Sequence, residues 1–133
     1  MDVHVHHESG DRYRVQIGDH ALTVDQPDSG NAGPTPTDLF VASLATCVAH
    51  YAGRFFARHG VDPDGFDINA TFAMANDRPA RVDRIDLMVR LPDGFPDELR
   101  ARLAAVVDHC TVHNSITTPP DLRVEMRKAA AAA

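Results

Sequence analysis

The middle of this sequence is a long apolar segment with almost no charge, and it decides how the rest of the chain must be arranged. At its start, Thr35 can cap a helix, Pro36 suits the first helical position, and Asp38 stands where a capping box places its acidic residue. At its other end, Gly60 suits the left-handed residue that follows a helix, so we predict a helix from Thr35 to about His59. Apolar side chains point to nearly every side of this helix, which predicts that it is buried all round at the centre of the fold.

The flanking segments alternate apolar and polar residues with period two, which is typical of β-strands. A second amphipathic helix is predicted from near Pro96 to about Cys110. The predicted strands lie around residues 3–6, 12–17, 21–24, 66–74, 85–91 and 122–126. The resulting order, β-β-β-α-β-β-α-β, predicts an α+β fold in a single domain that covers residues 1–133, with residues 1–10 and 128–133 peripheral or frayed.

The charge balance argues against two classes of partner. The chain has 13 Lys and Arg against 19 Asp and Glu, a net charge of −6 with neutral histidines, which does not suit a nucleic acid or an anionic membrane surface. The longest nearly uncharged stretch, Leu39–Gly53, is shorter than the roughly 20 residues that span a bilayer, so we expect a core helix. The N-terminal segment MDVHVHHESG shows no secretory signal, and we therefore expect a cytoplasmic protein.

The sequence has two cysteines, Cys47 inside the long helix and Cys110 after the second one. Each is followed three residues later by a histidine, His50 or His113. In a reducing cytoplasm a lasting disulfide is not expected, so the two residues are free thiols, a redox pair or metal ligands. The alternative is that each cysteine is only a small buried residue, since free cysteine is among the most buried residue types.

A cysteine acts as a nucleophile only as its thiolate, so a reactive cysteine needs a group that lowers its pKa. Cys47 lies about three turns inside its helix, where the effect of the helix N-terminus has faded. The activating group must therefore be a side chain. His50 lies on nearly the same helical face, and Arg12 or Arg14 could reach the thiol from an N-terminal strand.

Two motifs resemble a known family. GPTPTDLFVASLATC at the start of the long helix, and HCTVHNSI after the second one, resemble the OsmC/Ohr proteins, the osmotically inducible protein C and organic hydroperoxide resistance family. The resemblance extends from about Tyr13 to Met126. It implies an intertwined homodimer in which the long central helices pack against antiparallel sheets, with the reactive sites near the subunit interface.

The resemblance also implies chemistry for both thiols. Cys47 would be the peroxidatic thiolate, which attacks the O–O bond of an organic hydroperoxide and becomes a sulfenic acid, and Cys110 would be the resolving thiol that condenses with it to a disulfide. An external dithiol, such as a dihydrolipoyl group, would regenerate the enzyme, and no metal, flavin, haem or other cofactor is implied. The family's activating arginine corresponds best to Arg12, with Arg14 as the second choice.

One position departs from the family pattern. The family's catalytic glutamate lies ten residues before the helix cysteine, and Thr37 occupies that position here. A threonine hydroxyl forms hydrogen bonds but carries no charge to orient an arginine. The pattern more closely resembles the less characterised OsmC-like branch. Thr37, His50 and His113 are candidate modulators of the reactivity of the two thiols. Two hypotheses stay open: a cysteine-based hydroperoxide reductase, or a binding or redox-sensing module with little peroxidase activity.

The histidines also admit a metal-binding interpretation, which we do not favour. His4, His6 and His7 resemble a metal-binding tract, but histidines on an exposed strand are usually solvated. The segment from His109 to His113 lacks the paired spacing of zinc ligands. The sequence also contains no GxSxG element and no glycine-rich phosphate loop, which argues against a serine hydrolase and a nucleotide-binding protein.

Overall fold

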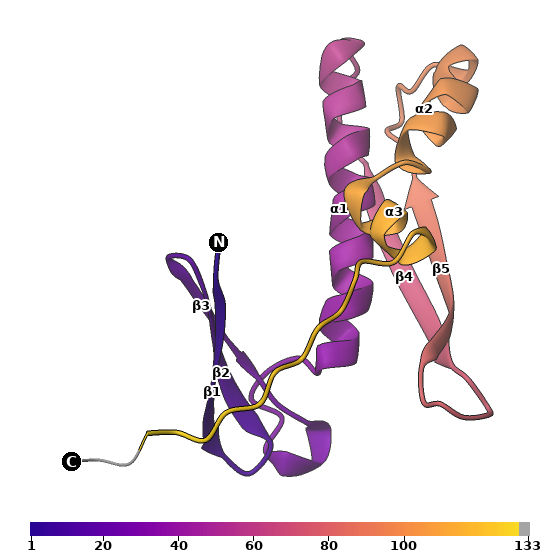
Figure 1. Cartoon of the computed structure of the whole chain (residues 1–133). Coiled ribbons are helices and arrows are strands. Elements are labelled where there is room, and N and C mark those ends of the chain that lie inside the picture. The colour runs from indigo at the N-terminus through magenta and orange to yellow at the C-terminus, as the bar shows by residue number, and fades with distance from the viewer. Residues whose placement is uncertain (131–133) are drawn as a thin grey trace.

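The computed structural model describes residues 1–130 and places two antiparallel sheets on either side of one long helix (Figure 1). The first sheet has the strand order β1-β2-β3, and the second pairs β4 with β5. The α+β class predicted from the sequence is confirmed. In chain order the elements are β1 (Val3–Ser9), β2 (Arg12–Ile17), β3 (His20–Val24), α1 (Pro36–Arg58), β4 (Asp67–Met74), β5 (Val82–Arg90), α2 (Arg100–Val107) and α3 (Thr111–Thr117).

The start of α1 forms as its sequence predicts. The Asp38 N–H donates to Thr35 Oγ1 at 3.1 Å, and the Thr35 N–H donates to Asp38 Oδ2 at 3.0 Å, so both halves of the capping box are present. Pro36 is the first helical residue. At the other end, Gly60 has a φ of 64°, the left-handed conformation that lets the chain turn away from the helix. The predicted boundaries of this helix are confirmed.

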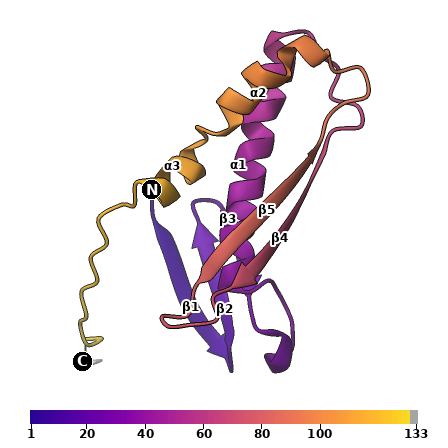
Figure 2. The same cartoon turned by 90° about the vertical axis from the view of Figure 1, so that its right-hand side faces the viewer.

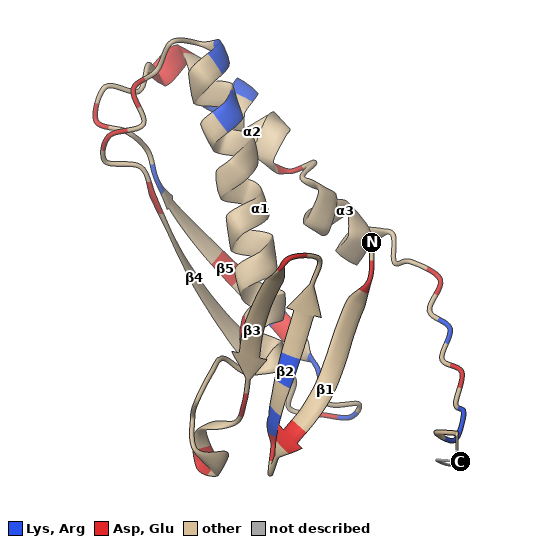
Figure 3. Ribbon diagram, turned by 90° about the vertical axis from the view of Figure 1, so that its left-hand side faces the viewer, with Lys and Arg blue, Asp and Glu red and all other residues tan. Residues whose placement is uncertain are grey.

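The burial of α1 differs from the prediction. One side of its C-terminal half packs in the main core, where Ala52, Phe55 and Phe56 meet Leu103 of α2. Much of the rest is open, and Phe40 is 41% exposed. The expectation of burial all round is wrong for a single chain, because the sheet and the short helices cover only one side of α1. Figure 3 shows how few charged residues interrupt this helix between its two ends.

By length and hydropathy α1 is the one helix, among the elements of residues 1–130, that could cross a membrane. Its C-terminal half instead takes part in a protein core. The Phe56 ring lies 4.9 Å from the Phe66 ring and 5.9 Å from the Phe95 ring, both in edge-on arrangements. Such pairs stabilise a core beyond their burial alone. These contacts support the prediction of a core helix.

The hairpin β4–β5 lies along α1 (Figure 2), and Ile85, Leu87 and Val89 of β5 line a cavity together with residues of α1. Ile68 pairs with Val89, and Ala70 pairs with Leu87, so the apolar positions of both strands share one side of the sheet. The β1–β3 sheet stands apart, near the N-terminal end of α1 (Figures 1 and 2). Residues 1–10, expected to be peripheral or frayed, contain the regular strand β1, all of whose residues are exposed.

Two predictions about the C-terminal third are wrong. The second helix does not continue to Cys110: α2 ends at Val107, and a separate helix, α3, begins at Thr111. The predicted strand at Leu122–Met126 is also missing, because residues 119–130 pair with no strand of the described chain. A strand needs a hydrogen-bonded neighbour, and this segment has none there. The expectation for residues 131–133 lies outside the described residues.

Candidate functional site

The structure brings the two thiols together although 63 positions separate Cys47 from Cys110 in the sequence (110 − 47). Cys47 lies in the middle of α1 and is partly exposed, whereas Cys110 is fully buried at the start of α3. Cys47 is close enough to Cys110 to raise the pKa of the Cys110 thiol, and both residues are free thiols. Figures 1 and 2 show α3 lying beside α1 at this level. Two neighbouring free thiols are the starting point of a dithiol–disulfide pair.

Cys110 occupies the N-cap of α3, where its sulfur accepts a hydrogen bond from the His113 backbone N–H at 3.4 Å. Burial raises the pKa of the Cys110 thiol, and the neighbouring Cys47 raises it further, while the His113 N–H opposes both effects. Cys110 is therefore protonated at neutral pH. Of the two thiols, only Cys47 can be reached by a molecule from solvent.

A second contact joins the same two helices. The Tyr51 hydroxyl and Thr111 Oγ1 are 2.9 Å apart, with Tyr51 one turn after Cys47 and Thr111 directly after Cys110. This pair was not predicted from the sequence. The position of Tyr51 on the Cys47 face of the helix was a visible signal, but its partner in α3 could be found only in three dimensions.

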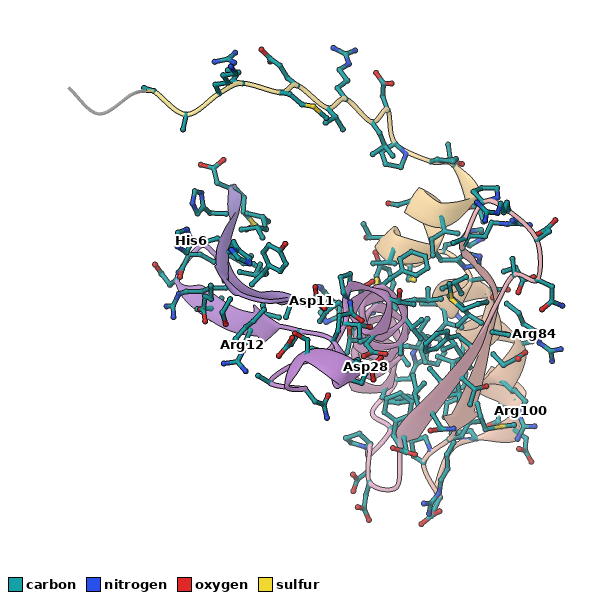
Figure 4. The ribbon with its side chains drawn as sticks, turned by 90° about the horizontal axis from the view of Figure 1, so that it is seen from below. His6, Asp11, Arg12, Asp28, Arg84 and Arg100 are labelled. Atoms are coloured by element: carbon teal, nitrogen blue, oxygen red, sulfur yellow. The ribbon has the colours of Figure 1, made fainter. Side chains whose placement is uncertain are left out.

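Arg12 is not beside the thiols. It lies at the start of β2 (Figure 4). Its Nε donates to Asp25 Oδ2 at 3.4 Å. The Asp25 carboxylate is fully buried and also accepts the backbone N–H groups of Gln26 at 2.8 Å and Ala32 at 3.0 Å. The hydrogen bond from Ala32 contributes most to lowering the pKa of Asp25, and the bonds from Gln26 and Arg12 add to it. Together they hold this pKa below its usual value despite burial. Within residues 1–130, no hydrogen bond or ion pair joins Arg12 to either cysteine.

Asp25 organises the loop that links β3 to α1. Its backbone N–H donates to the Pro34 carbonyl at 3.1 Å, which closes the loop just before the helix cap. Gly33 lies so close to β3 that a β carbon there would overlap the Thr23 carbonyl oxygen. The sequence of this segment is rich in Gly, Pro, Asp and Asn, which is typical of a loop. Composition alone could not distinguish the buried Asp25 from the exposed residues of the same loop.

The remaining candidates are dispersed. Thr37 lies in the first turn of α1, ten residues or about 15 Å along the helix from Cys47. Arg14 is exposed on β2, opposite His6 in register. His50 is exposed, with its ring 6.0 Å from the Tyr51 ring. None of these three residues therefore contacts the thiol pair through a hydrogen bond in the part of the chain that the structure describes.

A cavity of about 340 Å³ opens next to His113, between α1 and β5. Its lining is mainly apolar, with Leu44, Val48, Ile85, Leu87, Val89, Val107 and Asp108 completing it. Leu44 and Val48 flank Cys47 in the sequence, so the cavity borders the helix segment that carries the thiol. An apolar organic group fits such a lining better than a charged one.

The described residues contain no group of three or more His, Cys, Asp or Glu side chains that could hold a metal ion. His4 and His6 lie on the exposed strand β1, where the His7 ring lies 5.2 Å from the Tyr13 ring in a tilted arrangement. The thiols and His113 supply too few ligands for a zinc site.

Comparison with known families gives one match. The model of the family described as "OsmC-like protein" matches residues 28–125, which include both cysteines and the Asp25 loop from Asp28 onward. No curated protein matches the sequence.

Solved structures share the fold at low sequence identity. An OsmC-like protein from Mycoplasma pneumoniae has a TM-score of 0.76 at 15% identity, covering 89% of this chain and 87% of the other. The organic hydroperoxide resistance protein OhrB of Bacillus subtilis has a TM-score of 0.65 at 18% identity, covering 96% and 98%. An OsmC-like hydroperoxide resistance protein from Jannaschia sp. CCS1 has a TM-score of 0.60 at 19% identity, covering 93% and 90%. At these identities the likeness concerns the fold.

Proposed function

The chain belongs to the OsmC-like protein family, and from this premise we propose that it is a cysteine-based reductase of organic hydroperoxides. In this proposal Cys47 is the thiolate that meets the peroxide and Cys110 is the thiol that resolves the product. The observation that carries it is the pairing of one accessible and one buried thiol at the junction of α1 and α3.

The accessible thiol begins the cycle. The Cys47 thiolate attacks the terminal oxygen of the hydroperoxide, the O–O bond breaks, and the departing alkoxide takes up a proton as the alcohol. Cys47 is left as a sulfenic acid. The adjacent cavity, lined by Leu44, Val48 and Ile85, suits the organic portion of the substrate. This lining favours an alkyl or aryl hydroperoxide over hydrogen peroxide.

The buried thiol completes the cycle. Cys110 attacks the Cys47 sulfur, water leaves, and a disulfide forms between them. A small external dithiol, such as a dihydrolipoyl group, then reduces the disulfide by exchange. No bound cofactor takes part in these steps, and we place the activity in the cytoplasm.

The proposed enzyme is a homodimer. An activating cation is required to favour the Cys47 thiolate, yet Arg12 lies on a sheet that stands apart from the thiols of its own chain. The open side of α1 offers a surface on which a second copy can pack. We propose that Arg12 of the second copy reaches Cys47 across this interface, with Arg14 as the alternative.

The test uses purified protein with cumene hydroperoxide and excess dithiol. Wild-type protein should consume the peroxide, and Cys47→Ser should abolish consumption while the fold is kept. Addition of one equivalent of hydroperoxide without reductant should remove two hydrogens from the intact mass as the disulfide forms. Turnover that survives Cys47→Ser would eliminate the mechanism.

A binding or redox-sensing module is the second candidate. It is favoured by Thr37 in place of an activating carboxylate, and by the engagement of Arg12 with Asp25 rather than with a thiol. The two candidates differ in the pKa of Cys47, which pH-dependent alkylation measures. A value near that of free cysteine supports the module, and a strongly lowered value supports the reductase.

A further inference from the structure

One side-chain hydrogen bond ties together the two helices that carry the thiols. Tyr51 lies four residues after Cys47, so the two side chains share a face of α1. Thr111 is the first residue of α3 and follows Cys110 directly. The Tyr51 hydroxyl and Thr111 Oγ1 are 2.9 Å apart. The hydrogen bond therefore lies one residue from one sulfur and one helical turn from the other.

The helix α3 is short and packs against α1. It has seven residues, and none of them is buried. A helix this short is marginally stable by itself in water, so its position depends on tertiary contacts. Its N-cap is the Cys110 sulfur itself, which accepts the His113 N–H. Any movement of α3 along α1 would consequently move Cys110 relative to Cys47.

The position of Cys110 matters because its reactivity is low. Burial raises the pKa of this thiol, so only a small fraction is thiolate at neutral pH. The rate of disulfide formation then depends on how often the two sulfurs stand at bonding distance and angle. A disulfide tolerates Cα separations of only about 4.4–6.8 Å and dihedral angles near 90°, so a small displacement takes the pair out of range.

We propose that Tyr51 is a positioning residue for the resolving step, and that its hydroxyl holds Cys110 in reach of Cys47 through Thr111. The inference rests on the proposed function, because the step it serves belongs to that cycle. In this step Cys110 gives up its thiol proton, the S–S bond forms, and the S–O bond of the Cys47 sulfenic acid breaks. The leaving hydroxide takes up this proton and becomes water. Tyr51 is neither oxidised nor reduced in the step.

Tyr51→Phe and Thr111→Val each remove one partner of the hydrogen bond with little change of shape. After one equivalent of cumene hydroperoxide, samples are quenched with a thiol-blocking reagent and resolved by mass. Both variants should form the disulfide about 5-fold more slowly, the size expected for one net hydrogen bond. The rate of Cys47 sulfenic acid formation should not change. Excess peroxide should therefore convert more Cys47 to the sulfinic acid than in the wild type.

The other tyrosine of the chain supplies the matched control. Tyr13 lies on β2, away from α3 of its own chain, so Tyr13→Phe should leave the rate of disulfide formation at the wild-type value. The double variant, with Tyr51→Phe and Thr111→Val together, should be no slower than either single variant if the two residues act through one bond. Thermal melting of each variant checks that the fold is intact. Wild-type rates in both single variants, or losses that add in the double variant, would overturn the inference.

A second measurement does not depend on peroxide chemistry. The fraction of Cys47–Cys110 disulfide at equilibrium in glutathione buffers reports how well the fold holds the two sulfurs together. Both single variants should lower this equilibrium constant by a similar factor. A wild-type protein that forms the disulfide in the buffer but ignores hydroperoxide would contradict the proposed function alone. An equilibrium constant unchanged by either substitution would contradict the positioning role alone.

Discussion

At the scale of single residues, the two thiols stand in unequal surroundings that suit unequal tasks. Cys47 is partly exposed, so a substrate from solvent can reach it, while Cys110 is fully buried and kept protonated. A buried thiol with a raised pKa is also protected from direct oxidation, because oxidants react with thiolates. In the proposed cycle, Cys110 would therefore stay reduced until Cys47 has been oxidised.

The raised pKa of Cys110 predicts a pH dependence for disulfide formation. Its thiolate fraction should keep growing as pH rises past the ordinary cysteine value of 9.0, because the folded-state pKa lies above that value. The rate of disulfide formation after sulfenic acid formation should rise over the same range without levelling off at an ordinary cysteine pKa. Stopped-flow or rapid-quench rates between about pH 7 and pH 10 measure it. A plateau near neutral pH would show that Cys110 is not the slow nucleophile.

Thr37→Glu tests the missing carboxylate. If Arg12 of a second copy activates Cys47, a glutamate at this position should help to orient the guanidinium and lower the pKa of Cys47. A reduction by one unit would raise the peroxidase rate at neutral pH by about 10-fold. Ser43→Glu, an exposed change on the same helix, is the control for added negative charge. An unchanged rate with the fold intact would show that Arg12 is held by other means or is not involved.

Asp25 is the residue that holds Arg12 in this structure, and its removal should act on stability in a pH-dependent way. The pKa of Asp25 is lowered by folding, so its ionised form stabilises the fold above the unfolded value of about 3.8. This contribution is lost as pH falls through the lower folded-state pKa. Asp25→Asn should therefore lower the melting temperature at pH 7, and the gap to wild type should narrow in strong acid. Asp28→Asn, on an exposed side chain of the same loop, should show no such gap at any pH.

At the scale of elements, the link between β3 and α1 is built as a fixed connector. The Asp25 carboxylate and the Pro34 carbonyl close the loop, and the capping box of Thr35 and Asp38 begins the helix directly after it. The loop is thus attached both to the strand that carries Arg12 and to the helix that carries Cys47. In the proposed dimer, this connector would therefore link the arginine that serves one site to the Cys47 of the other site.

Gly33→Ala tests how closely that connector packs. A β carbon at this position would overlap the Thr23 carbonyl oxygen, and a backbone atom can move only if β3 or the loop moves with it. We expect a loss of about 1–3 kcal/mol of unfolding free energy, as is typical of overpacking. Gly94→Ala is the control, since a β carbon at position 94 would have no other atom within 4 Å. Equal denaturation midpoints for the two variants would show that the loop is looser than the structure indicates.

At the scale of the whole molecule, one chain leaves several large apolar side chains exposed. The open side of α1 includes Phe40, and the C-terminal segment exposes Leu122, Val124 and Met126 by 82%, 85% and 90%. These three side chains alternate with Arg123 and Glu125, the pattern of a strand with one apolar face. Contiguous patches of this kind usually mark an interface. A second copy of the chain would cover the open side of α1 and the apolar face of the C-terminal segment.

The C-terminal segment is therefore expected to pair with a strand of the second copy, since strand edges accept an added strand readily. Leu122→Asp combined with Val124→Asp should shift the protein from dimer toward monomer or aggregate. Light scattering coupled to size-exclusion chromatography measures this. Arg123→Ala changes the opposite face and should leave the dimer intact. A wild-type protein that is monomeric at micromolar concentration would refute the expectation.

The sequence alone determined every feature that depends on near neighbours in the chain. The capping box at Thr35, the left-handed Gly60 and the strand alternation of both sheets are local patterns, because helices and strands repeat every 3.6 and 2 residues. The tertiary structure alone decided which distant groups meet. It placed Cys110 beside Cys47 and brought Tyr51 within hydrogen-bonding distance of Thr111. It also paired Arg12 with Asp25 rather than with a thiol. Side-chain periodicity says which face a residue occupies but not what packs against that face. For this reason the sequence could not show that residues 122–126 lack a strand partner within the described chain, or that one side of α1 stays open.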